Sequence, residues 1–65
     1  MTREIAVVVD SGVVIIFNPV THPNVLRDAQ ELRLPLMMFH VDDADPVLYE
    51  RQKDDARACM EAHVT

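Results

Sequence analysis

The chain of 65 residues contains one cysteine, one glycine and no tryptophan. Its single thiol, Cys59, cannot form an intrachain disulfide or supply a four-ligand zinc site of the usual cysteine spacing. Its single glycine, Gly12, excludes a glycine-rich phosphate-binding loop. No apolar run is long enough to cross a bilayer, and no basic, cleavable leader is recognisable. We therefore expect one compact domain over residues 1–65, located in a reducing cytoplasm.

Positive charge is also scarce. Six Lys and Arg residues stand against eleven Asp and Glu residues, which gives a net charge of −5. The excess lies in residues 42–65, which hold seven carboxylates and three cations, whereas residues 1–41 are almost balanced. An acidic chain repels phosphate backbones and anionic lipids, so direct binding of nucleic acid or membrane is not expected. A basic protein is the expected partner.

Residues 5–17 form the most apolar stretch, two β-branched runs joined by Asp10-Ser11-Gly12. This pattern is typical of a β-hairpin. With Gly12 as the left-handed residue of a three-residue loop, Val9 lies opposite Val13. Both faces of the hairpin are apolar and must be covered. We expect one face to carry Ile5, Val7, Val9, Val13, Ile15 and Phe17, and the other Ala6, Val8, Val14 and Ile16.

The next segment predicts a helix over residues 23–33, which begins after Thr21 or His22 and must end before Pro35. The apolar spacing predicts that its buried stripe consists of Val25, Leu26, Ala29 and Leu32. The apolar run 36–41 predicts a third strand that runs in the direction of the second. Either hairpin strand can be its neighbour. We assign to the core Leu36, Met37, Met38, Val41 and Val47.

A second helix is predicted to follow, with Asp45 as its N-cap and Pro46 as its first residue. At 100° per residue its apolar stripe consists of Leu48, Tyr49, Gln52, Ala56, Cys59, Met60 and His63. The opposite side carries Glu50, Asp54 and Glu61. The predicted fold is α+β, in the order ββαβα, with a three-stranded sheet built on the N-terminal hairpin and packed by two helices.

The carboxylates of the last third are the main candidate binding site. Residues four apart on a helix stand about 5–6 Å apart, so a row of carboxylates can imitate the phosphates of one DNA strand. The candidate partner-binding residues are Asp42, Asp43, Asp45, Glu50, Asp54, Asp55 and Glu61. The alternative is a solvated helix face that keeps an apolar small protein in solution.

Other candidate chemistry is weak. His40 and Asp42 alternate on the third strand and His22 lies within reach, but this spacing is not a recognised metal signature. Cys59 and His63 share a helix side, yet a buried thiol packs as a small apolar group. We therefore expect no catalytic residue, metal or cofactor, and a protein that is not an enzyme. Tyr49 is expected at the edge of the core, and the alternative is that it anchors a partner interface.

In size, charge and architecture the chain resembles the small acidic inhibitors encoded by phages and mobile elements. It is most similar to the anti-CRISPR proteins, including those that act on type I surveillance complexes. The resemblance implies stoichiometric occlusion in the host-cell cytoplasm: an acidic helix face that acts as a DNA mimic against a basic subunit of a CRISPR–Cas effector. The alternative is a small dimeric regulatory or structural subunit, a homodimer whose interface is the apolar hairpin face.

Overall fold

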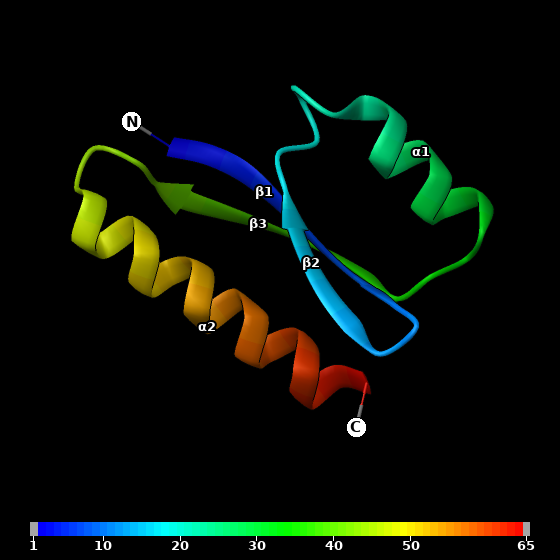
Figure 1. Ribbon diagram of the computed structural model, residues 1–65. Helices are drawn as coiled ribbons and strands as arrows, with labels where there is room; N and C mark the ends of the chain where they lie inside the picture. The colour runs from blue at the N-terminus through cyan, green and yellow to red at the C-terminus, as the bar shows by residue number, and fades with distance from the viewer. Residues whose placement is uncertain (1, 65) are drawn as a thin grey trace.

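A computed structural model describes residues 2–64 and confirms an α+β fold in the order ββαβα. The elements, coloured along the chain in Figure 1, are β1 (Thr2–Asp10), β2 (Val13–Phe17), α1 (Pro23–Glu31), β3 (Leu36–Asp42) and α2 (Pro46–Val64). The molecule is flat, with principal extents of 33 × 26 × 13 Å.

The hairpin turn has two residues, so the predicted three-residue loop is wrong. Asp10 lies opposite Val13, and Ser11 and Gly12 between them have φ values of 54° and 81°. A two-residue turn with both central residues at positive φ matches the right-handed twist of the flanking strands. Ser11 accepts this conformation although it is not glycine, and its Oγ donates to Asp10 Oδ1 at 3.2 Å.

The shorter turn shifts the register by one residue and exchanges the two faces of β2. Val9 lies opposite Val14, and Val7 lies opposite Ile16. Because side chains alternate along a strand, a shift of one residue moves every β2 side chain to the other side. The side that we call the α2 face therefore carries Ile5, Val7, Val9, Val14, Ile16, Met37, Phe39 and Val41. The other side, the α1 face, carries Ala6, Val8, Val13, Ile15, Phe17, Leu36, Met38 and His40.

The sheet has the order β2-β1-β3, one of the two predicted orders, with β1 antiparallel to both neighbours. β3 therefore runs in the direction of β2, as predicted. The hydrophobic residues of β1 from Ile5 to Val8 are all at most 2% exposed, so the central strand is buried on both faces. The β1 strand thus needs a covering layer on each side.

Helix α2 covers the first of these faces. Met60 and Ala56 pack against Ile5, Val7 and Val41 in one buried cluster. Met60 is fully buried, and burying such a side chain contributes about 1.5–3 kcal/mol to folding. This cluster fixes the rotation of α2 and decides which of its residues face outward.

Helix α1 covers part of the opposite face. Its buried residue Ala29 lies near Val8 and Ile15 of the hairpin. The helix ends at Glu31, before the predicted Arg33, because the next residues form a left-handed C-terminal cap. Arg33 has a φ of 56°, its N–H donates to Gln30 O at 3.2 Å, and Leu34 N–H donates to Ala29 O at 3.0 Å.

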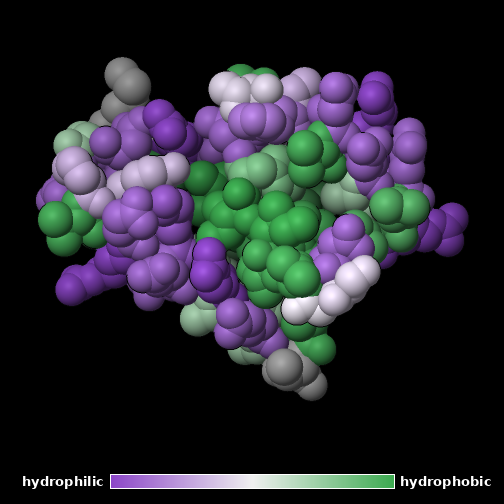
Figure 2. All heavy atoms as spheres, viewed as in Figure 1, coloured by the Kyte–Doolittle hydropathy of each residue, from purple (hydrophilic) through white to green (hydrophobic). Residues whose placement is uncertain are grey.

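Several predicted core residues are exposed instead. Leu32 and Val25 of the expected α1 stripe are 66% and 37% exposed, because α1 ends early and lies over the hairpin only along its Ala29 side. Val47 is exposed in the first turn of α2, on the side away from the sheet. Met38 projects from the α1 face of β3, which α1 does not cover, whereas Met37 packs on the cluster. Figure 2 shows apolar side chains gathered over β2, between the two helices.

The left-handed Arg33 gives a test of the fold. An L-residue in this conformation costs about 1–2 kcal/mol, whereas glycine adopts it freely but loses about 0.4–1 kcal/mol of unfolded-state entropy. We expect Arg33→Gly to stabilise the protein by about 0.5–1 kcal/mol and to raise Tm by several degrees, measured by thermal and urea unfolding. The control Arg33→Ala keeps a Cβ and should give no such gain. An equal gain in both variants would contradict the left-handed cap.

Candidate interaction surface

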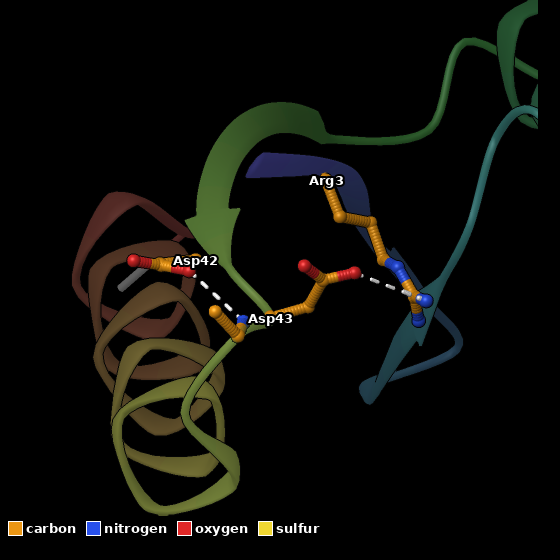
Figure 3. A network of polar contacts seen from close by, with 4 residues as sticks. Arg3, Asp42 and Asp43 are labelled. Carbon is orange, nitrogen blue, oxygen red and sulfur yellow. Dashed lines mark hydrogen bonds and ion pairs between the residues drawn. The ribbon is translucent and has the colours of Figure 1, made fainter. Parts of the chain in front are cut away.

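The turn between β3 and α2 is built from three of the candidate aspartates. Asp42 Oδ1 accepts a hydrogen bond from Ala44 N–H at 2.9 Å, and Gln52 of α2 accepts one from the Asp42 N–H at 2.7 Å. Asp43 Oδ2 lies 3.2 Å from the Arg3 guanidinium on β1, as Figure 3 shows. These contacts close the turn and hold the start of α2 against the sheet.

Asp45 is the N-cap of α2, as predicted. Its Oδ1 accepts hydrogen bonds from Val47 N–H at 3.0 Å and Leu48 N–H at 3.4 Å. Its own carbonyl accepts the first helical bond, from Tyr49 N–H at 2.8 Å. A carboxylate at this position satisfies amides that would otherwise lack partners and lies at the positive end of the helix dipole. Asp42, Asp43 and Asp45 therefore have structural roles, and one carboxylate oxygen of each is already engaged.

A cluster of alternating charge surrounds Tyr49 at the start of α2. The Lys53 ammonium lies 4.8 Å and the Arg3 guanidinium 5.6 Å from the centre of the Tyr49 ring. Lys53 Nζ also pairs with Glu50 Oε1 at 2.9 Å, and this hydrogen bond raises the pKa of Lys53. Tyr49 packs at the core edge, as expected. The sequence analysis did not include Lys53 among the site residues. A charged residue is expected in solvent, but the aliphatic part of the Lys53 side chain is half-buried beside Tyr49.

The outer side of α2 carries the remaining carboxylates. Glu50, Asp54 and Glu61 are exposed and share one side of the helix, as their spacing predicts. Asp55 is exposed about 100° away around the axis. Within residues 2–64, no ion pair is found for Asp54, Asp55 or Glu61. The seven predicted residues therefore do not form one uninterrupted row.

Cationic side chains interrupt this acidic surface. Exposed Arg51 and Arg57 belong to the same helix, and α2 as a whole holds four carboxylates against three cations. An open groove of about 530 Å³ separates α2 from the end of β2. Its walls carry both signs of charge, from Glu50, Lys53, Asp54 and Arg57, above a floor that includes Ile16 and Phe17. The surface suits a partner with its own pattern of charges better than a uniformly basic one.

The other predicted site residues do not assemble. Cys59 is exposed and not buried as predicted, because α2 is rotated toward Lys53 and away from the Cys59 side. His63 is also exposed. His22 bonds to Thr21 through Nδ1 at 2.8 Å, and His40 projects from the exposed α1 face of β3. No group of three metal-ligating side chains occurs among the described residues.

Comparison with known proteins finds no matching family model, no matching curated protein and no matching solved structure. Over the part of the chain that the structure covers, no helix has the length and apolar character needed to cross a membrane.

The N-cap role of Asp45 is testable by truncation. Asp45→Ala leaves the first α2 amides without their acceptor and should cost about 1 kcal/mol, which corresponds to a decrease in Tm of roughly 4–8 °C for a domain of this size. Asp55→Ala, on an exposed position of the same helix, should change stability by less than about 0.5 kcal/mol. Equal losses in the two variants would show that Asp45 has no special role.

The hydrogen bond from Ala44 lowers the pKa of the Asp42 carboxyl below its ordinary value of 3.8. A folded-state pKa below the unfolded one adds stability above about pH 3.8, and this contribution is lost as the pH falls through the folded value. Replacing Asp42 by Asn should therefore reduce the stability difference between pH 6 and about pH 3, measured by urea unfolding. Asp55→Asn is the matched control and should leave the pH dependence nearly unchanged.

Proposed function

We propose that this protein is a non-enzymatic inhibitor that covers the basic nucleic-acid-binding surface of another protein with the outer side of α2. The observation that carries the proposal is the exposure of Glu50, Asp54 and Glu61 on one side of a long helix. The net charge of −5 adds long-range attraction to a cationic partner. A subunit of a CRISPR–Cas effector, in particular of a type I surveillance complex, is the partner class that the sequence resemblance suggests.

The rigidity of α2 supports this role. The helix is capped by Asp45, held by the turn at Asp42 and Asp43, and packed through Met60. Carboxylates on a fixed helix lose little freedom on binding, so more of their attraction to a partner appears as affinity. Asp42, Asp43 and Asp45 act in this proposal mainly by holding the helix, and the exposed carboxylates make the contact.

The arginines of α2 give the proposed contact its selectivity. Arg51 and Arg57 repel a surface of unbroken positive charge, so the best partner places carboxylates or neutral groups opposite them. This differs from a strict imitation of DNA, in which every charge is negative. The proposed mechanism is therefore local charge complementarity that blocks access of nucleic acid, without a cofactor or a covalent step.

A second candidate function is a small dimeric regulatory or structural subunit. The exposed apolar side chains of β2, Val13 and Ile15, favour this candidate. Such residues on an edge strand form an association surface. The two functions use different sides of the molecule and are compatible with each other.

Charge reversal tests the inhibitor function. We expect the protein to block binding of a double-stranded DNA target by a purified type I surveillance complex at near-stoichiometric ratios. The double variant Asp54→Lys, Glu61→Lys should lose at least about tenfold in potency, since each reversed charge replaces an attraction by a repulsion. Inhibition by the unchanged protein should also weaken between about 0.05 and 0.3 M salt as screening increases. Competition is measured by fluorescence anisotropy of labelled DNA.

The control carries the same change in net charge elsewhere. Glu4→Lys, Glu31→Lys places two lysines outside α2 and outside the groove beside β2, and should retain inhibition. Equal losses in both double variants would indicate that only net charge matters. Unimpaired DNA binding in the presence of excess unchanged protein would reject this partner class, and circular dichroism checks that each variant is folded.

A further inference from the structure

Strand β2 is an edge strand without the features that usually prevent edge pairing. It lies at one side of the sheet with β1 as its neighbour, and the sequence Val13–Phe17 contains no charge, proline or glycine. Monomeric proteins usually place lysine, proline or a bulge on such an edge. The side chains of Val13 and Ile15 are 59% and 39% exposed. A neutral, apolar and exposed edge is a template for another strand.

The backbone of β2 is oriented for such pairing. Val9 N–H donates to Pro35 O at 3.1 Å, on the β3 side of β1. Alternate residues of a strand bond to opposite neighbours, so the even-numbered residues of β1 bond to β2. Their partners across the ladder are Val13, Ile15 and Phe17. Val14 and Ile16 therefore direct their N–H and C=O groups away from the sheet, along the free edge.

An apolar groove runs beside this edge, on the α1 face. It has a volume of about 240 Å³, and six of its lining residues are apolar: Val8, Ile15, Val25, Ala29, Leu32 and Leu34. Two carboxylates, Asp10 and Asp28, also line it. Figure 2 shows the green apolar area over β2, flanked by the hydrophilic surfaces of the helices. A strand added to β2 would place alternate side chains next to this groove and cover it.

The other free edge, β3, is less suited to pairing. It ends at Asp42, is followed by Asp43, and carries exposed His40. A symmetric antiparallel pair about Phe39 would place the Asp42 carboxylate of each copy opposite Leu36 of the other. Charge at a strand end is one of the features that discourage such pairing. Strand β2 has no charged residue at either of its ends.

We propose that two copies of this chain associate through β2, antiparallel about a two-fold axis near Ile15, to form one six-stranded sheet. In this register Val14 of each copy pairs with Ile16 of the other, and both residues direct their backbone groups outward as the pairing requires. Ile15 lies opposite its equivalent and Val13 lies opposite Phe17, so each apolar side chain meets another. The edge is complementary to itself, which an isologous dimer requires.

The placement of charge also favours a second copy. The antiparallel arrangement places Asp10, beside the turn, near the Phe17 end of the other strand and far from the other Asp10. The pairing therefore brings no like charges together along the edge.

Oligomeric state is the direct test. Sedimentation velocity and light scattering of the full chain should give a dimer at micromolar concentration. Ile15→Lys places two lysines opposite each other at the axis and should raise the dimer dissociation constant at least about tenfold. Val47→Lys introduces the same side chain at an apolar α2 position that is 76% exposed, and this control should remain dimeric. A monomeric unchanged protein at several hundred micromolar would overturn the proposal.

Amide exchange provides a readout that does not depend on a variant. The Val14 and Ile16 amides face solvent in a monomer but are bonded in the dimer, so their protection should increase with protein concentration. Fast, concentration-independent exchange at both positions in a dimeric sample would place the interface elsewhere and reject β2 pairing. If Ile15→Lys does not fold, Val13→Lys tests the same contact at a more exposed position, next to the turn. Dimerisation unchanged in a folded Val13→Lys variant would also count against the proposed register.

Discussion

The burial of β1 on both of its faces is the constraint on which the rest of the structure depends. Ile5 and Val7 face α2, while Ala6 and Val8 face α1, and all four are nearly inaccessible to water. A strand of this kind needs a full layer on each side. Residues 2–64 provide one helix of 19 residues and one of 9. The long helix completes the α2 face, whereas the short helix leaves the edge of the α1 face at β2 uncovered.

Local chemistry made much of this fold predictable. Asp45-Pro46 is an N-cap followed by a first-turn proline, and both residues act as their types suggest. The ββαβα order follows from apolar runs separated by turn residues, each readable within a few positions. The common side of Glu50, Asp54 and Glu61 follows from the helical period alone, so this part of the candidate surface also required only the sequence.

The errors arose where the sequence contains no local discriminating signal. A two-residue and a three-residue turn both use Gly12 at positive φ, and a hairpin apolar on both faces lacks the alternation that selects a register. The predicted rotation of α2 about its axis was wrong, because the Lys53 side chain packs on the Tyr49 ring and Cys59 is exposed to solvent. The ion pair of Asp43 could not be predicted, because its partner Arg3 is 40 residues away in the chain. Long-range pairing of this kind depends on the assembled sheet.

The two proposed surfaces reinforce each other through the symmetry of the sheet. In the proposed dimer the two-fold axis is perpendicular to the plane of the sheet and passes between the two β2 strands. The two copies of α2 therefore lie on the same side of a continuous sheet. Their outer sides, with Asp54 and Glu61, point away from the sheet and take no part in edge pairing. Two moderately acidic helices held at a fixed separation can engage two basic sites together, and the second contact forms at high effective concentration. A single helix with four carboxylates and three cations imitates nucleic acid only weakly. In the proposed dimer, two such helices on one rigid sheet would supply the reach and avidity that the proposed inhibition requires.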